Sequence, residues 1–180
     1  MASDLTGYEI GKTRRDELDR LPEIERAAAA VFSPDDLPAE LRDEVHDLSF
    51  FEQAAATGRL WVARALSPPL LVGFAVVELV DGSAHLAEMD VHPHHGRRGL
   101  GRALVGEAVR WGQRSGYRSL TLTTFRHLRW NGPFYASLGF FELERKRQGP
   151  ELSAILAAEA NEGLDASKRV AMKMDLEATD

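Results

Sequence analysis

Two spacings of apolar residues alternate along the chain and predict a domain that mixes strands with helices. Apolar residues three or four positions apart indicate amphipathic helices, whereas apolar runs and strict alternation indicate strands. The predicted elements are, in order, a strand at Tyr8–Lys12, helical regions at Arg14–Phe32 and Pro38–Thr57, strands at Leu60–Leu66, Leu70–Val80 and Ala84–Val91, a helix at Gly99–Ser115, a strand at Ser119–Phe125, a short helix at Asn131–Leu138, a strand at Phe140–Lys146, a helix at Pro150–Gly163 and a strand at Val170–Leu176. Pro22 predicts a kink or a late start in the first helical region, and the second region can form one long helix or two short ones.

Turn residues join three of the predicted strands into an antiparallel meander. Asp81-Gly82 separates the second of these strands from the third, and Asp-Gly is typical of a tight hairpin because glycine tolerates positive φ. Helices separate the later strands, and no repeat or long linker divides the chain. We therefore expect one α/β domain over residues 1–180, with a mixed sheet of about seven strands and helices on both faces.

The composition predicts a folded globular protein. The chain has 180 residues, of which 44% are hydrophobic, and a net charge of −6, a composition unlike that of disordered chains. Its longest apolar run, Leu70–Val77, is much shorter than the roughly 20 residues that cross a bilayer. Met1–Ile10 lacks the pattern of a signal peptide. We expect a cytoplasmic protein with no membrane partner, and the acidic balance argues against a nucleic-acid partner.

The absence of cysteine excludes disulfides, thiolate zinc sites and cysteine nucleophiles. His92, His94 and His95 are alternative metal ligands, but three imidazoles crowded into one turn form a poor coordination geometry. We expect no metal site, and we interpret these histidines as loop residues beside a bound phosphate.

The strongest chemical signal lies in residues 89–104, where a strand runs into a glycine-rich turn that opens a helix. Such a turn directs free backbone N–H groups and the positive end of the helix dipole at one point, which suits a phosphate or pyrophosphate. Two common nucleotide motifs do not fit. A P-loop requires Lys and then Ser or Thr after its last glycine, where Arg102-Ala103 stands. A dinucleotide fingerprint requires Gly or Ala at position 104 and an acidic residue about 20 positions later. Leu104 occupies the first position, and no acid stands in Thr121–Thr124.

This segment closely resembles the acyl-CoA-binding segment of the GNAT superfamily of N-acyltransferases, V-x-P-x-x-R/Q-x-x-G-x-G/A. Val91, Pro93, Gly99 and Gly101 fill the pattern, and Gly96 stands where Arg or Gln is usual. Residues 131–140 resemble the superfamily's Asn…(F)YxxLGF segment, with the Asn closer to the Tyr than is common. The element order also matches the superfamily's fold, which is mostly antiparallel.

The resemblance implies an N-acetyltransferase with acetyl-CoA as cosubstrate. It assigns cofactor contacts to two segments, namely Met89, Val91, Gly96, Arg97, Arg98, Gly99, Leu100, Gly101, Arg102 and Ala103 in the first and Asn131, Phe134 and Tyr135 in the second. It also places Tyr135 where family members often protonate the departing CoA sulfur, although a tyrosine beside Phe134 can equally be a core aromatic. A homodimer is a family-level expectation.

The reaction needs a base, because a primary ammonium has a pKa near ~10.4 and must lose its proton before it attacks a thioester. The two-residue period of a strand puts Glu88 and Asp90 on one face. We expect Glu88 to be the base, directly or through water, with Asp90 as the alternative; both can also be solvated or salt-bridged carboxylates. A bulge would reverse this assignment of faces. A strand N–H near Val91 would polarise the thioester carbonyl.

Three features of the sequence bear on the identity of the acceptor. Residues 35–52 contain seven acids and one base, which would attract a cationic small-molecule amine if they line the acceptor site, or would form a solvated helix face if they do not. Trp130 can line that site or cap the core. The helix after Pro150 can narrow the acceptor cleft or form a dimer contact. A protein N-terminus or lysine as acceptor, and a non-catalytic CoA-binding regulatory module, are the alternative functions.

Overall fold

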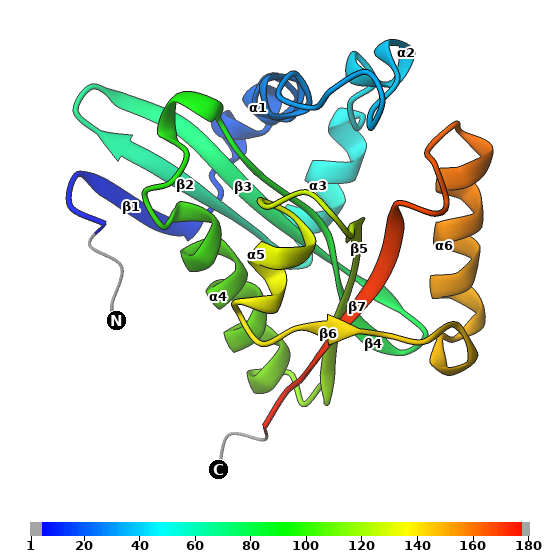
Figure 1. Ribbon diagram of the computed structural model, residues 1–180. Helices are drawn as coiled ribbons and strands as arrows, with labels where there is room; N and C mark the ends of the chain where they lie inside the picture. Colours follow the sequence, from blue (N-terminus) through cyan, green and yellow to red (C-terminus); the bar gives the residue numbers. More distant parts are fainter. Residues whose placement is uncertain (1–4, 178–180) are drawn as a thin grey trace.

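The centre of the computed structural model, which describes residues 5–177, is a single seven-stranded sheet (Figure 1). Its strands are β1 Tyr8–Lys12, β2 Leu60–Leu66, β3 Pro69–Val80, β4 Ser83–Val91, β5 Ser119–Phe125, β6 Phe141–Glu142 and β7 Arg169–Asp175. They lie in the order β1-β2-β3-β4-β5-β7-β6. All neighbours are antiparallel except β4 and β5, which are parallel. The predicted fold class is confirmed.

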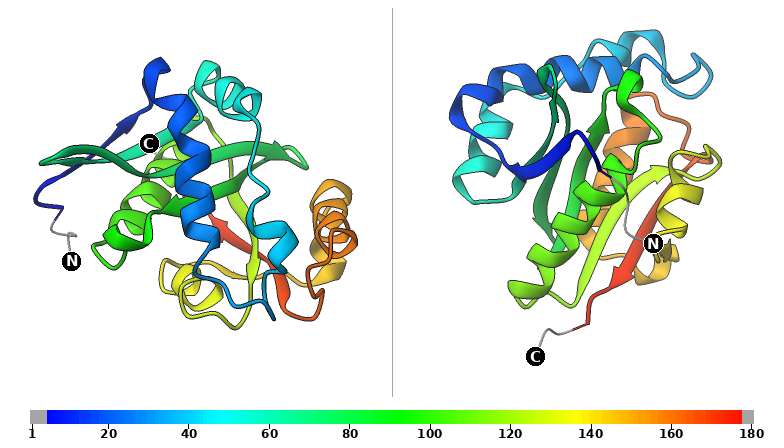
Figure 2. Two further views of the ribbon diagram at one scale, coloured as in Figure 1. Left: turned by 90° about the horizontal axis from the view of Figure 1, so that it is seen from above. Right: turned by 90° about the vertical axis from the view of Figure 1, so that its left-hand side faces the viewer.

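Helices cover both faces of the sheet, as predicted (Figure 2). They are α1 Leu21–Ala29, α2 Ala39–Arg42, α3 Leu48–Ala56, α4 Leu100–Arg114, α5 Gly132–Ala136 and α6 Pro150–Asn161. One face carries α4 and α5, and the other carries α1, α3 and α6. Within residues 5–177, no helix combines the length and the hydrophobicity that a membrane crossing requires.

Both faces of the central strands are buried, which explains their almost unbroken apolar sequences. In β2, every residue of the stretch 60–65 is buried. Trp61 belongs to the core beneath α4, together with Leu104. Val62 points the opposite way, into the core beneath α1 and α3, together with Phe51. Each of these large side chains contributes about 1.5–3 kcal/mol by leaving water, so the two cores hold the helices against opposite faces.

Three local predictions are refined by the structure. Pro22 stands in the first turn of α1, after a 3₁₀ helix at Arg15–Arg20, so the predicted late helix start is confirmed. The region 38–57 forms two short helices. The strand predicted at 140–146 is wrong beyond its first residues, because Leu143 turns inward to pack with Leu152 of α6 and a 3₁₀ helix follows it.

The Asp81-Gly82 hairpin is confirmed, and it also holds α6 in place. Both residues have positive φ, +50° and +69°, as a two-residue turn of this kind requires. The Asp81 carboxylate accepts hydrogen bonds from the backbone N–H groups of Glu151 (2.9 Å) and Leu152 (3.0 Å). These are orphan donors of the first turn of α6, so the β3–β4 turn caps a helix about 70 residues further along the chain.

Gly73 allows the end of β4 to lie against β3. It pairs with Val91, and a Cβ at this position would lie 2.8 Å from the Asp90 carbonyl oxygen and 3.3 Å from a Val91 methyl carbon. The contact at 2.8 Å is with backbone, which cannot move aside by a side-chain rotation. The position of Asp90 and Val91 therefore depends on a glycine in the neighbouring strand.

We predict that Gly73→Ala lowers the free energy of unfolding by about 1–3 kcal/mol, the usual cost of overpacking, as measured by urea denaturation. Gly106→Ala is the control, because an added Cβ in α4 would meet the flexible Arg110 side chain at 3.4 Å. That variant should gain about 0.5–1 kcal/mol from improved helix propensity. Equal effects of the two substitutions would contradict this account.

Candidate active site

The site lies where β4 and β5 separate. The two parallel strands are paired only at Ala84 with Leu120 and at His85 with Thr121, and β4 then continues for six residues along β3 alone, ending at Val91. The N–H of His92 donates to Val72 on the β3 side. Because successive amides of a strand point to opposite edges, the Val91 N–H points into the gap, where a carbonyl oxygen could accept a hydrogen bond.

A bulge in β4 decides which face carries the two candidate carboxylates. Val76 pairs with Glu88 but Val77 pairs with Leu86, so Ala87 is the extra residue. Leu86 belongs to the core beneath α4, whereas Glu88 lies beside Glu25 of α1 on the opposite side. Glu88 and Asp90 follow the bulge and lie on one face of the sheet, as predicted. Because of the bulge this is the face that carries α1, whereas Leu86, two residues before Glu88, points toward α4.

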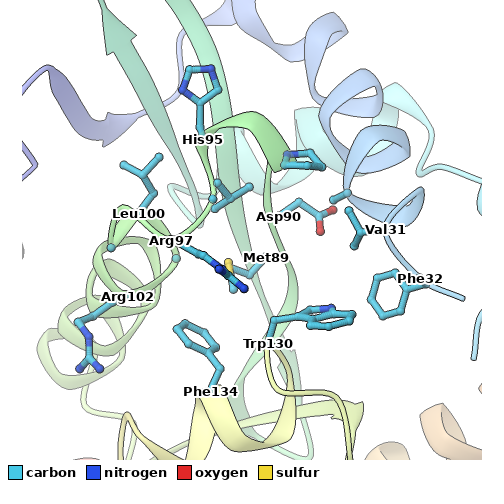
Figure 3. Close-up of a pocket in the computed structure, with 16 residues that line it drawn as sticks. Val31, Phe32, Met89, Asp90, His95, Arg97, Leu100, Arg102, Trp130 and Phe134 are labelled. Carbon is cyan, nitrogen blue, oxygen red and sulfur yellow. The ribbon is translucent and has the colours of Figure 1, made fainter.

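A cavity of about 640 Å³ opens at the end of β4 (Figure 3). The residues that line it are Ala28, Val31, Phe32, Met89, Asp90, Val91, Pro93, His95, Gly96, Arg97, Gly99, Leu100, Gly101, Arg102, Trp130 and Phe134. They come from the end of α1, the end of β4, the glycine-rich turn, the start of α4 and the segment around α5. One space therefore joins the predicted phosphate-binding turn to the carboxylate of Asp90.

The glycine-rich turn has the geometry of an anion site. Gly99 precedes the first residue of α4 with φ of +83°, a conformation that glycine adopts without strain. The first-turn amides of the 15-residue helix have no partner within the helix, and no acidic side chain stands in that turn. Arg97 and Arg102 add positive charge at the same end of the cavity. Gly101 packs against Phe134, whose ring would lie 3.4 Å from an added Cβ.

Most of the predicted cofactor residues line this cavity, but four of them do not. Arg98 lies over the ring of Tyr8, 5.9 Å from its centroid. Ala103 is absent from the lining and donates its N–H to Gly99 within the helix. Asn131 keeps its side-chain oxygen buried without a hydrogen-bond partner in the described structure. Tyr135 is 7% exposed and packs against Phe134 and Phe140.

The two carboxylates have different surroundings. Asp90 lines the cavity, whereas Glu88 is not among the lining residues. Burial, with the nearby Glu25 carboxylate, raises the pKa of Glu88 from 4.5 to about 7, and His46 opposes this shift. Burial and the carboxylates of Glu88 and Glu25 raise the pKa of Asp90 well above its usual value. A carboxyl group that titrates near neutrality suits general-base chemistry.

Glu25 and His46 were missed in the sequence. The carboxylate of Glu25 accepts from the His46 backbone N–H (3.1 Å) and lies 2.7 Å from the His46 Nδ1. Glu25, His46 and Glu88 each offer one atom that can bind a metal ion, and these three atoms lie within 4.8 Å of one another. The hydrogen bond to Glu25 raises the pKa of His46, so an imidazolium is favoured beside the Glu88 carboxyl. No local signal identifies this cluster, because its members are far apart in the chain.

Comparison with known proteins agrees with this geometry. Residues 19–140 match the Acetyltransferase (GNAT) family. The protein is a member of the GNAT family.

Solved structures share the fold. PaiA N-acetyltransferase from Thermoplasma acidophilum, in complex with coenzyme A, is 18% identical over 93% of this chain and 98% of its own, with a TM-score of 0.68. A GNAT-family acetyltransferase from Staphylococcus aureus Mu50 is 16% identical over 94% and 99%, with a TM-score of 0.70. The ribosomal-protein-S18-alanine N-acetyltransferase of Escherichia coli is 19% identical over 96% of both chains, with a TM-score of 0.65. The three structures agree in architecture along nearly the whole of this GNAT chain.

The histidines of the turn have local partners in this GNAT protein. His95 Nδ1 lies 2.9 Å from the Tyr8 hydroxyl, and His92 Nδ1 accepts from the backbone N–H of His94 at 3.3 Å. Of the three, only His95 lines the cavity. Among the described residues, the group whose donors are close enough for a metal ion is Glu25, His46 and Glu88 instead.

Neither the acidic segment 35–52 nor the helix α6 lies at this cavity. None of the seven acids of residues 35–52 lines the cavity, and Asp36 is engaged with Lys168 (2.9 Å) and His127 (3.0 Å). No described residue of α6 lines it either, because α6 packs on the β7 half of the sheet (Figure 1). Trp130 does line this cavity and is half exposed.

We predict that His46→Gln moves the titration of Glu88 to higher pH, because the variant removes the cation that stabilises its ionised form. Carbon NMR of the labelled glutamate carboxyl groups measures the midpoint. Glu25, Arg169 and Asp90 also act on Glu88, and all three remain in the variant. His94→Gln, in the exposed turn, is the control and should leave the midpoint in place. A fall in the midpoint in His46→Gln would contradict the arrangement.

Proposed function

We propose that the protein transfers an acetyl group from acetyl-CoA to the primary amine of a small molecule. The observation that carries this proposal is the continuity of the cavity, which runs from the amides and arginines at the start of α4 to the Asp90 carboxylate beside the gap between β4 and β5. An anion is stabilised at one end by free amides and the helix dipole. At the other end stands Asp90, and Glu88, two residues earlier on the same strand, is the proton acceptor of this proposal.

In this mechanism the pyrophosphate of acetyl-CoA lies on the turn at residues 96–102 and the thioester lies in the gap. The Val91 N–H donates to the thioester carbonyl oxygen and stabilises the negative charge that develops there. The amine nitrogen attacks the carbonyl carbon, a carbon–nitrogen bond forms and the carbon–sulfur bond breaks. Starting from the ammonium form, the nitrogen loses one proton before the attack and a second as the amide forms. The thiolate gains one proton, so each turnover releases one proton to solvent.

Glu88 is the base in this proposal, and Asp90 positions the amine. With a pKa near 7, Glu88 is substantially ionised at neutral pH and still binds a proton well enough to remove it, directly or through water. Asp90 borders the cavity and can accept a hydrogen bond from the amine. Glu25 and His46 act as positioning residues, because the Glu25–His46 pair sets the charge beside Glu88.

Tyr135 is the proposed acid. Burial and the carboxylates of Glu88 and Asp90 raise its pKa, so the hydroxyl carries its proton at neutral pH and is available as a hydrogen-bond donor. A phenol that stays protonated can donate to the sulfur as the carbon–sulfur bond breaks. The aromatic neighbours Phe134 and Phe140 hold the ring in one position.

We predict that Glu88→Gln lowers kcat about 10²–10⁴-fold, the usual contribution of a general base. The assay is thiol release from acetyl-CoA with a panel of amines, and the chain's lack of cysteine keeps the background low. In the wild-type protein kcat should rise with pH through about 7, because ionisation of Glu88 creates the base. A Glu88→Gln variant with the wild-type kcat and pH profile would assign the base elsewhere.

We predict that Tyr135→Phe lowers kcat about 10²-fold, the lower limit of the usual range for acid–base catalysis, and leaves the KM for acetyl-CoA within about twofold of the wild type. Tyr117→Phe is the matched control, because Tyr117 stacks on Trp111 at the far end of α4. Coenzyme A binding without thiol release from any acceptor would instead favour a regulatory CoA-binding protein. A lysine or N-terminal peptide as the sole good acceptor would favour a protein substrate.

A further inference from the structure

The two ends of the cavity have opposite chemistry. Arg97 and Arg102 come from the glycine-rich turn and the first turn of α4, and the Arg97 side chain extends from the turn toward Met89 (Figure 3). The other end is formed by Val31 and Phe32, which follow α1, and by Trp130, which precedes α5 (Figure 3). Val31 is 47% exposed and Trp130 is 50% exposed. Large apolar side chains that remain in solvent at the wall of a cavity mark a surface for an apolar ligand group.

This apolar wall is held in place by its neighbours. The Phe32 ring lies 6.1 Å from the Trp130 ring in an edge-on arrangement and 5.4 Å from the Phe125 ring. Phe125 is in turn covered by the Arg169 guanidinium, 4.5 Å from the ring centroid, which Glu159 fixes at 2.8 Å. Aromatic rings fixed in this way lose little conformational freedom when a flat group binds against them.

The charges of the cavity oppose a polycationic acceptor. Asp90 is the single acidic side chain among its described lining residues, whereas Arg97 and Arg102 are both basic. One amino group can form a hydrogen bond with Asp90. A second ammonium on the same molecule would meet either the apolar wall or like charge, and a cation without a partner is costly to desolvate.

We propose that the acceptor is a monoamine in which a short chain joins the primary amino group to an aromatic or similarly flat apolar group. The amino group lies at Asp90, and the flat group packs against Val31, Phe32 and Trp130. This inference rests on the proposed function, because it requires the amine to meet a bound acetyl group. It replaces the cationic acceptor that residues 35–52 suggest in the sequence with a singly charged, apolar one.

The test compares kcat/KM for 2-phenylethylamine, ethylamine and putrescine, each measured by thiol release from acetyl-CoA with EDTA present. Burial of a phenyl ring on an apolar wall is expected to favour 2-phenylethylamine over ethylamine by about 10–100-fold, and putrescine should be the poorest acceptor. Trp130→Ala should remove most of the preference for the phenyl group, chiefly through KM. Phe141→Ala, an exposed aromatic residue on β6, is the matched control and should keep the preference.

A second variant, Val31→Glu, tests the same wall in case Trp130→Ala fails to fold. Val31→Glu places a carboxylate on an exposed part of the wall and should lower kcat/KM for 2-phenylethylamine while raising it for putrescine. Wild-type kcat/KM values for ethylamine or putrescine equal to or above that for 2-phenylethylamine would overturn the inference and leave the proposed acetyl transfer standing. Thiol release with none of the acceptors in the wider amine and peptide panel would instead overturn the proposed function itself.

Discussion

The separation of β4 from β5 is the constraint on which the rest of the site depends. Two paired residues at the start of β4 hold the strands together, and every later amide on that edge of β4 is left for another partner. The sheet remains stable because β4 pairs with β3 along its whole length and β5 pairs with β7 over seven residues. Each of the two strands therefore keeps one paired edge, and the edges that face each other across the gap are the ones left without a strand partner.

Charge is arranged around this gap so that each end of the cavity stabilises a different group. The free amides and arginines at the start of α4 favour an anion. On the other side, burial disfavours ionised carboxylates and raises the pKa values of Glu88 and Asp90. The Glu25–His46 pair supplies a cation beside Glu88 and limits that rise. The same low-polarity surroundings keep Tyr135 protonated, so one desolvated region supports both a base and an acid.

The features predictable from the sequence are those with a local cause. The Asp81-Gly82 hairpin, the α4 start at Gly99 and the meander all follow from turn chemistry and apolar spacing. The bulge at Ala87 has no such signal, because alanine fits a regular strand as well as a bulge. The Glu25–His46 pair depends on a loop that brings residues 21 positions apart into contact. The acidic residues of the segment 35–52 suggested a cationic acceptor, but none of them lines the cavity. The charge of a segment does not determine where the fold places it.

The central claim is that the gap beside Val91 receives acetyl-CoA, and amide hydrogen exchange measured by NMR with and without acetyl-CoA tests it most directly. The account predicts slower exchange on binding at Val91 and at the first-turn amides of α4, with no change in β1 or at the Asp81-Gly82 hairpin. Unchanged exchange at Val91 and Gly101 under saturating acetyl-CoA would contradict the account.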